Sequence, residues 1–280
     1  MIRIMTANIW GGYFGNPVEE RANYLIKTVG EYSPDVIGFQ EVTRAWNDSS
    51  AFKKLLAEYD TVGAEQSYAG NHVPLMVKKK YRILEKGFKR FADTPDGSKA
   101  ISFAVLRDGD GNVFAVCNTH FWWMSGFESD EVKQNQHKWL GDIAYFTNEE
   151  HENVRASNAR ALVSVMKRLH EEYSCPVFAF GDMNCTTRSR VFTDVYKNSG
   201  VVHLFSAADE KDDICTLHAD PVSDGKGGWH GNPPTKTQID SIDHIVALGG
   251  GFRALRYRIV TDKSALDTSD HSPVYADIEI

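Results

Sequence analysis

Residues 176–184 read PVFAFGDMN, an apolar run from Pro176 to Phe180 followed by Gly181-Asp182-Met183-Asn184. A short continuous apolar run with a turn signal after it is typical of a strand buried on both faces. Polar side chains at the end of such a strand are costly to bury unless they hydrogen-bond or bind a metal. The same plan recurs at Thr6-Ala7-Asn8, Gln40-Glu41, Asn118-Thr119-His120, Ile242-Asp243-His244-Ile245 and Ser269-Asp270-His271-Ser272-Pro273-Val274. This recurrence indicates one polar site built from the ends of several strands.

The chain has 280 residues, of which 42% are hydrophobic and 25% charged, as in ordinary soluble globular proteins. This length fits one large domain or two small ones, with enough chain to bury a sizeable core. The formal net charge of −7 argues against a sequence-independent grip on long duplex nucleic acid, which needs many cations facing phosphates. The basic run Lys78-Lys79-Lys80 is typical of a solvated turn.

The chain carries four cysteines without a C-x-x-C pair, which favours reduced thiols in a reducing compartment. Strand pattern begins at Ile2, which leaves no room for the apolar stretch of a signal peptide. No segment is long and apolar enough to predict a transmembrane helix. We therefore expect a cytoplasmic location.

Hydrophobic periodicity predicts a mixture of strands and a few amphipathic helices. Helices are expected at Pro17–Tyr32, Phe52–Glu58, Val154–Glu172 and Arg190–Lys197. Strands are expected at Ile2–Ala7, Val36–Phe39, His72–Val77, Ile83–Phe91, Ile101–Leu106, Val113–Asn118, Pro176–Phe180, Ile242–Leu248, Phe252–Thr261 and Val274–Ile280. Ser125–Thr147 has no clear pattern, and Asp209–Thr237 reads as a long loop. Strands without strict β-α-β alternation predict an α+β layered sandwich.

The polar residues at the predicted strand ends suit cleavage of a phosphoester. That reaction needs a cation on the phosphoryl oxygens, a deprotonated and aimed water, and a stabilised leaving oxygen. Glu41, Asp270 and Asn8 offer the hard oxygen ligands that select Mg²⁺, Mn²⁺ or Ca²⁺. The chain has no H-E-x-x-H motif and no cysteine cluster, which argues against a site of the zinc-protease kind.

The remaining residues supply groups that move protons and orient the substrate. His271 directly follows Asp270, and Asp243 is a candidate acceptor that orients its imidazole. Asp182 and Asn184 lie two residues apart on a turn, where both side chains can point at the attacking water and the phosphate. His120 is placed to add a further donor to the phosphoryl group.

Each of these residues also has a simpler explanation when taken alone. Asn8 is a common turn former, Glu41 a possible exposed cap, and Gly-Asp-x-Asn a common turn composition. A single histidine such as His120 is more often a hydrogen-bonded core residue than a catalytic one. The joint occurrence in this order favours the chemical interpretation.

The motifs, in this order, resemble those of the endonuclease/exonuclease/phosphatase superfamily. The resemblance runs from the first strand to the last, which implies a single domain over residues 1–280. It implies a four-layered α/β sandwich, in which two mixed, mainly antiparallel β-sheets pack face to face with helices on the outside. Members cut phosphodiesters or phosphomonoesters with Mg²⁺ or Mn²⁺, and include pancreatic-type deoxyribonucleases, apurinic-site endonucleases, deadenylases, inositol-polyphosphate 5-phosphatases and neutral sphingomyelinases.

The resemblance assigns a role to each motif residue. It implies that Glu41 is the principal metal ligand, with Asn8 beside the metal and Asp270 close to it. The catalytic residues that it implies are His120, Asp182, Asn184, Asp243 and His271. Asp243 would hold His271, and His120 would be the first of the two family histidines. Near the start of the long helix, the resemblance implies a polar pair that reaches the phosphate, Arg155 and Asn158.

Two departures from the family pattern bear on the substrate. Asn71 aligns where many relatives carry a glutamate that supports the first histidine, which predicts a less basic His120. Relatives often continue Thr-His-Leu-Asp, whereas this chain has Trp122 and Trp123. These rings are either a stacking platform for a base, sugar or lipid headgroup, or a core aromatic pair. Trp229 and His230 of the long loop are expected to face them across the site.

The sequence therefore predicts a Mg²⁺- or Mn²⁺-dependent hydrolase for a small phosphoester or a single-stranded nucleic acid. We expect no grip on long duplexes and infer no obligate protein partner. The alternatives are a DNA or RNA endonuclease or exonuclease, a sphingomyelinase-type lipid phosphodiesterase, and a binding-only relative without catalysis. The last is disfavoured because Glu41, Asp182, Asn184, Asp243 and His271 are all present.

Overall fold

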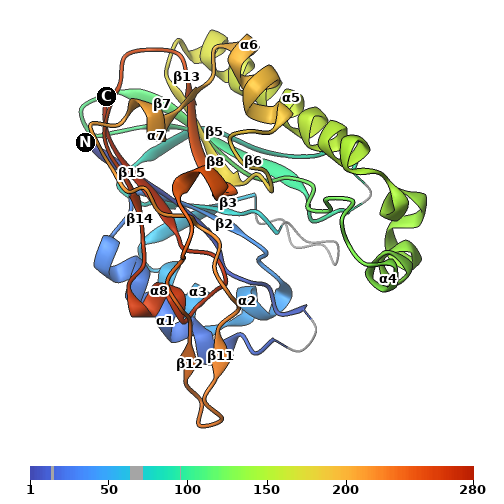
Figure 1. Ribbon diagram of the computed structural model, residues 1–280. Coiled ribbons are helices and arrows are strands. Elements are labelled where there is room, and N and C mark those ends of the chain that lie inside the picture. Colours follow the sequence, from blue (N-terminus) through green and yellow to red (C-terminus); the bar gives the residue numbers. More distant parts are fainter. Residues whose placement is uncertain (14–15, 64–71, 95) are drawn as a thin grey trace.

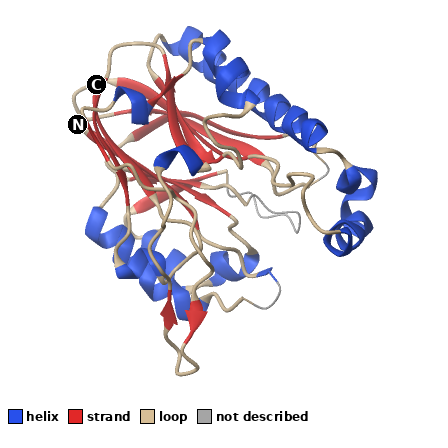
Figure 2. Ribbon diagram, in the orientation of Figure 1, coloured by secondary structure: helices blue, strands red, loops and turns tan. Residues whose placement is uncertain are grey.

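The computed structural model describes residues 1–13, 16–63, 72–94 and 96–280. Two large β-sheets pack face to face, and most helices lie on their outer faces (Figures 1 and 2). This arrangement confirms the predicted α+β sandwich. Within the described residues, no helix is long and apolar enough to cross a membrane.

The first sheet has seven strands in the order β10-β14-β15-β1-β2-β4-β3. The strands are β1 (Ile2–Asn8), β2 (Val36–Gln40), β3 (Tyr59–Val62), β4 (Leu75–Lys78), β10 (Glu210–Lys211), β14 (Arg253–Ile259) and β15 (Val274–Glu279). β1 pairs in parallel with β2, as β10 does with β14, and the other pairs are antiparallel. In β1, Ile2 and Ile4 pack between the sheets, whereas Met5 and Ala7 pack under the helices. Both faces of this strand are therefore buried.

The second sheet has six strands in the order β5-β6-β7-β8-β13-β9. The strands are β5 (Arg82–Arg90), β6 (Ala100–Arg107), β7 (Val113–His120), β8 (Val177–Asp182), β9 (Val202–His203) and β13 (Asp243–Leu248). β7 and β8 are parallel, and their neighbours are antiparallel. The sheets are thus mixed and mainly antiparallel, as predicted.

Helices cover the two outer faces. The α-helices of the described residues are α1 (Glu19–Tyr32), α2 (Arg44–Asp48), α3 (Ser50–Leu55), α4 (Asp130–Leu140), α5 (Asn148–Tyr173), α6 (Lys197–Ser199), α7 (Leu204–Ala207) and α8 (Lys263–Leu266). Apolar side chains of α1 and α3 form a core with the first sheet, and those of α5 form another with the second sheet. A third core fills the space between the sheets. The sandwich therefore has four layers, which are two sheets and a layer of helices on the outer face of each.

Several predicted boundaries are corrected by local interactions. The helix predicted to begin at Val154 begins at Asn148, because Thr147 and Glu150 form a reciprocal capping box. The helix predicted at Arg190–Lys197 is a π-helix at Val191–Tyr196. The Asp209–Thr237 loop carries β10 and a two-stranded hairpin of β11 (Val222–Ser223) and β12 (Trp229–His230).

Gly181 occupies a position where a larger residue should destabilise the fold. Its backbone φ is +148°, and an added Cβ would lie 1.9 Å from the Thr119 carbonyl oxygen. We expect Gly181→Ala to lower the free energy of unfolding by about 3 kcal/mol, through backbone strain and overpacking. Gly250→Ala is the matched control, since a Cβ there meets no atom within 4 Å. Urea unfolding measures both, and equal stability of the two variants would contradict the assignment.

Candidate active site

Strand register brings the predicted polar residues to one edge of the sandwich. Asn8 pairs with Gln40 at the ends of β1 and β2. In the other sheet, Asp182 at the end of β8 pairs with His120 of β7 on one side and Asp243 of β13 on the other. Residues far apart in sequence thus become neighbours, because the ends of β7 and β8 meet the start of the antiparallel β13.

Asn8 connects the two sheets at this edge. Its Nδ2 donates hydrogen bonds to Glu41 Oε1 (3.2 Å) and to Asp182 Oδ2 (3.0 Å). Its Oδ1 accepts the Trp10 N–H at 3.1 Å. Asn8 is therefore placed to orient two carboxylates, and its role beside a metal stays a prediction.

Glu41 sits just past β2 in a left-handed backbone conformation with φ 61°. Its Oε2 accepts the Gly11 N–H at 2.9 Å. Burial alone would raise the pKa of Glu41, but the positive fields of His120 and Lys99 and the Gly11 N–H outweigh burial and lower it. The side chain is therefore held as a carboxylate, the form that binds a cation.

Two histidines converge on Asp182. His120 Nε2 lies 3.3 Å from Asp182 Oδ2, and His271 Nε2 lies 4.0 Å from the same oxygen. Burial opposes ionisation of Asp182, but the charge and hydrogen bond of His120 prevail, so the pKa of this carboxyl lies well below its usual range. Asp182 is therefore a charged acceptor at the centre of the site.

His271 is held by Asp243 as the sequence predicts, with His271 Nδ1 2.8 Å from Asp243 Oδ2. Burial alone would lower the pKa of His271, but the charges of Asp243 and Asp270 and the Asp243 hydrogen bond raise it well above its ordinary value. This imidazole therefore carries a proton near neutral pH in the metal-free protein.

Asn184 is fixed in a turn directly after Asp182. Its backbone N–H donates to Asp182 Oδ1 (2.9 Å), and its Nδ2 donates to the Phe121 carbonyl oxygen (3.1 Å). Its φ of 48° is left-handed. The turn thus binds the Asn184 backbone to Asp182, and the predicted orientation of both side chains toward a water and a phosphate stays a prediction.

The carboxylates Glu41 and Asp270 fit a divalent cation. Burial and the neighbouring charge of Glu41 raise the pKa of Asp270, which means that two half-buried carboxylates repel each other here. Asp270 Oδ1 accepts a hydrogen bond from Ser269 Oγ at 3.2 Å. A cation beside both carboxylates would remove the repulsion, and hard oxygen donors suit Mg²⁺ or Mn²⁺.

A second candidate cation site shares the pocket. Ligand atoms of Asp182, Asp243 and His271 lie within 4.8 Å of one another. Asp243 Oδ1 is buried without a hydrogen-bond partner in the described part of the chain. However, Asp243 and His271 already bind each other through His271 Nδ1, and Asp182 is already flanked by two histidines. We therefore favour Glu41 and Asp270 as the principal ligands.

Two buried cations at the site were missed by the sequence reasoning. Lys99 Nζ lies 2.8 Å from His120 Nε2, and nothing in the local pattern around Lys99 signals this contact. The Arg21 guanidinium is buried and donates to four backbone carbonyls, those of Ile9, Trp10, Pro17 and Thr268. The sequence predicts the helix Pro17–Tyr32 on which Arg21 lies, but it does not predict these contacts.

Arg155 and Asn158 do not reach toward a substrate, contrary to the expectation. Both side chains are buried. Arg155 binds Glu152 Oε1 at 2.7 Å and the Met124 carbonyl oxygen at 2.6 Å. Asn158 accepts the Trp122 N–H and donates to Thr94 Oγ1, each at 3.0 Å. These residues instead hold the chain that follows β7.

The tryptophans are only partly where the sequence places them. Trp122 is fully buried, and its Nε1 donates to His151 Nδ1 at 2.8 Å, so of the two alternatives for Trp122 the structure favours the core residue over the stacking platform. Trp123 is half-buried against Trp122, with ring centroids 6.4 Å apart. Its stacking role stays a prediction.

Trp229 and His230 lie in the β11–β12 hairpin, which projects beside α1 (Figure 1). Trp229 Nε1 donates to Glu20 Oε2 at 2.8 Å, and its ring packs edge-on against Trp10. His230 is exposed near Lys263. Both are therefore anchored to the first sheet's helices rather than among the residues around Asp182. Asn71 lies outside the described residues.

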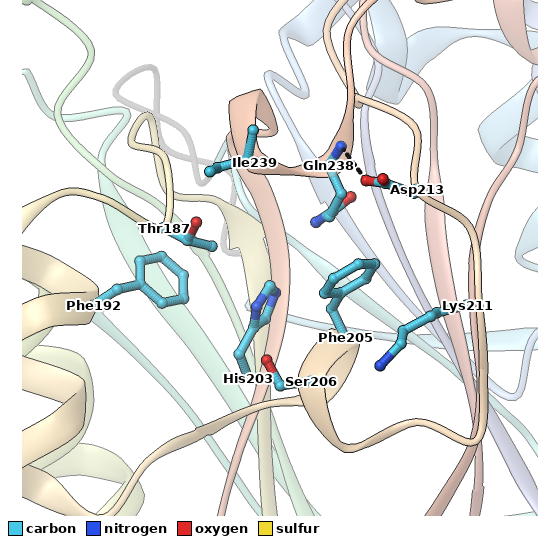
Figure 3. A pocket seen from close by; sticks show the side chains of 9 residues that line it. All are labelled: Thr187, Phe192, His203, Phe205, Ser206, Lys211, Asp213, Gln238 and Ile239. Carbon is cyan, nitrogen blue, oxygen red and sulfur yellow. Dashed lines mark hydrogen bonds between the residues drawn. The ribbon is translucent and has the colours of Figure 1, made fainter.

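A separate cavity of about 540 Å³ lies beside the π-helix, α7 and β10 (Figure 3). Phe192, His203 and Phe205 form its aromatic wall, and Lys211 and Asp213 stand at its edge. The His203 ring is surrounded by aromatic rings, including those of Phe192 and Phe205. None of the predicted site residues lines this cavity.

Comparison with known proteins identifies the family and the fold of the chain. The family model described as the Endonuclease/Exonuclease/phosphatase family matches residues 5–271. No curated protein sequence matches the chain. A Bacteroides vulgatus endonuclease/exonuclease/phosphatase structure has a TM-score of 0.71 at 21% identity, covering 100% of this chain and 98% of that one.

Two further structures share the fold at low identity. A mannosyl-6-phosphatase from Bacteroides thetaiotaomicron has a TM-score of 0.69 at 17% identity, with both chains covered completely. The human Nocturnin catalytic domain, determined with bound sulfate, has a TM-score of 0.68 at 16% identity and covers 99% of this chain and 94% of that one. With the family model spanning nearly all of its length, the chain belongs to the endonuclease/exonuclease/phosphatase family of hydrolases.

Proposed function

We propose that this protein is a Mg²⁺- or Mn²⁺-dependent phosphoester hydrolase acting on a small or single-stranded substrate. One observation carries the proposal: a continuous chain of contacts runs from Glu41 through Asn8 to Asp182, where His120 and His271 meet. It joins a cation-binding carboxylate to the groups that handle protons. Such a juxtaposition is what phosphoester hydrolysis requires.

Glu41 and Asp270 would hold the divalent cation, and Asn8 would orient Glu41 toward it. When bound, the cation supplies Lewis-acid polarisation of the phosphoryl group and offsets its charge. Family enzymes generally use divalent metals, and the choice between Mg²⁺ and Mn²⁺ is part of this proposal.

The chain's own residues position and protonate the reactants. Asp182, held as a carboxylate, accepts a hydrogen bond from the attacking water and aims it. Asn184, fixed beside it, donates its amide to a phosphoryl oxygen. His120 donates to the same group, and His271, held by Asp243, stabilises the charge that develops there.

The negative net charge and the relatives favour a small substrate. A net charge of −7 disfavours a long duplex, whose binding depends on many lysine and arginine contacts to phosphates. A phosphatase for a sugar phosphate has the same fold. The nuclease alternative remains an outcome of the test.

One observation favours a lipid substrate as the second candidate. All residues of α4 are at least partly exposed, and its Trp139 is 84% exposed. Phe127, which precedes this helix in the chain, is 81% exposed. Exposed large aromatic side chains in one segment are typical of contacts with partners or membranes. This patch would serve a sphingomyelinase-type lipid phosphodiesterase.

A substrate panel tests the proposal. Sugar phosphates, nucleotides, single-stranded oligonucleotides, plasmid DNA and sphingomyelin vesicles are incubated at matched Mg²⁺ or Mn²⁺, with and without EDTA. We expect EDTA-sensitive release of phosphate or cleavage with small or single-stranded substrates. Rapid plasmid nicking alone would make the protein a duplex nuclease, and turnover of vesicles alone would favour the lipid candidate.

Glu41→Gln keeps the side-chain shape but removes the charge that attracts a cation. Titration calorimetry is expected to show at least about tenfold weaker Mg²⁺ or Mn²⁺ binding, the loss of at least about 1.4 kcal/mol. Glu131→Gln on α4, an exposed position, is the control and should bind as the wild type does. Unchanged affinity in Glu41→Gln would remove Glu41 from the metal site.

His271→Ala removes a group that acts on the transition state. We expect kcat to fall by about 10²–10⁴-fold with KM within a few-fold of the wild type. The exposed His137→Ala variant should keep wild-type kinetics. A kcat within a few-fold of wild type would leave His271 a structural residue.

The His271–Asp243 pair also predicts a pH dependence of stability. The folded-state pKa of His271 is raised, so its stabilising effect is complete below the unfolded pKa of about 6.5 and declines as pH rises toward the folded value. Asp243→Asn should therefore cost more unfolding free energy at about pH 6 than at about pH 9. Urea unfolding across this range measures it, and a constant difference would contradict the coupling.

A further inference from the structure

Lys99 is a buried lysine placed directly before β6. Its side chain is only 5% exposed. The turn that holds it is fixed by the Lys99 N–H donating to the Asp96 carbonyl oxygen at 3.1 Å. Its Nζ lies 2.8 Å from His120 Nε2 and 3.3 Å from His120 Nδ1. The ammonium group thus rests against the nitrogen edge of a predicted catalytic histidine.

Within the described residues, this ammonium has no close carboxylate partner. Among the described residues, no carboxylate oxygen lies within 4.0 Å of Lys99 Nζ, although Asp96, Glu41 and Asp182 act on it from farther away. Burial is the main effect on the Lys99 pKa, and it lowers this pKa. A buried charge without an opposite charge beside it costs folding free energy, so retaining one favours a role toward a ligand.

The ligand that fits this position is an anion beside His120. His120 Nε2 is 3.3 Å from Asp182 Oδ2, and Asp182 also binds Asn8 and the Asn184 backbone N–H. A phosphoryl group that accepts from His120 and Asn184 would therefore lie within reach of the Lys99 ammonium. The remaining charged groups around Lys99 are carboxylates. Their negative charge needs a compensating cation before the phosphoryl group, which is also an anion, can enter.

We propose that Lys99 binds a non-bridging phosphoryl oxygen of the substrate and selects phosphomonoesters over phosphodiesters. This inference rests on the proposed function and names its substrate class. A phosphomonoester carries up to two charges on three non-bridging oxygens, whereas a phosphodiester carries one charge on two. Asn184 and Lys99 donate to two oxygens of a monoester, and His120 donates to the third once Lys99 turns from His120 Nε2 to the phosphoryl group. The additional lysine charge therefore favours the dianion.

The test compares Lys99→Met, Lys99→Arg and the exposed control Lys89→Met. Titration calorimetry measures inorganic phosphate binding, and kcat/KM is measured with p-nitrophenyl phosphate and bis-p-nitrophenyl phosphate. We expect Lys99→Met to lose about 10²–10³-fold on the monoester, as when one transition-state donor is removed, and less than about tenfold on the diester. Lys99→Arg should recover part of both monoester activity and phosphate binding. Lys89→Met should match the wild type.

Thermal unfolding separates a binding role from a structural one. Replacing a buried ammonium that has no carboxylate beside it in the described part of the chain by an apolar side chain of similar length should leave the Lys99→Met melting temperature unchanged or raise it. A lower melting temperature with equal losses on both substrates, and no recovery in Lys99→Arg, would make Lys99 structural and overturn the proposal. If Lys99→Met does not fold, Lys99→Gln replaces it under the same criteria.

The failure of the proposed function has a different signature. A wild-type protein that turns over neither these esters nor any substrate of the panel above, with or without Mg²⁺ or Mn²⁺, would refute the hydrolase proposal. Phosphate binding would still report on Lys99, since it needs no turnover. Wild-type and Lys99→Met proteins that bind phosphate equally would overturn the Lys99 inference, as would a wild type that prefers the diester and is slowed equally on both esters by Lys99→Met.

Discussion

The hydrogen bonds of one amide group, Asn8 Nδ2, connect the two halves of the site. They reach Glu41 in the first sheet and Asp182 in the second, so the distance between these carboxylates depends on how the sheets pack. A buried polar group of this kind is stable only when its partners are fixed. The apolar core between the sheets therefore does more than stabilise the fold, because it sets the geometry of the candidate metal ligand relative to the proton-handling residues.

Backbone strain is concentrated around this amide. Trp10, Glu41 and Asn184 all adopt left-handed conformations, which cost free energy for residues with a Cβ. Arg21 offsets that cost near Trp10 by donating to the Trp10 carbonyl oxygen and stacking on its ring, 4.7 Å from the centroid. Since Arg21 also binds the Thr268 carbonyl oxygen, it ties the loop after β1 to the loop that carries Asp270. Arg21 therefore holds together the two loops that flank the site.

The sequence predicts the layers of the fold and the location of the strand-end residues, because periodicity reports burial and parallel register brings strand ends together. Trp122 shows where this reasoning stops: an aromatic residue beside a catalytic motif has the same local pattern whether it lines a pocket or fills a core. Arg155 likewise lies where a phosphate contact is plausible, yet Glu152, one turn earlier on α5, satisfies it. Lys99 and Arg21 depend on contacts between distant segments, which no local pattern encodes.

The charges of the site differ between its two sides. Asp182 is flanked by His120 and His271, so its negative charge is compensated within the protein, whereas Glu41 and Asp270 repel each other. The two regions therefore differ in what they can accept. In the proposed function, the Glu41–Asp270 side would attract a cation, and the side lined by His120, His271 and Lys99 would attract an anion. A phosphoryl group bound with a divalent cation satisfies both demands at once, because its charged oxygens can face the cation and the donors together.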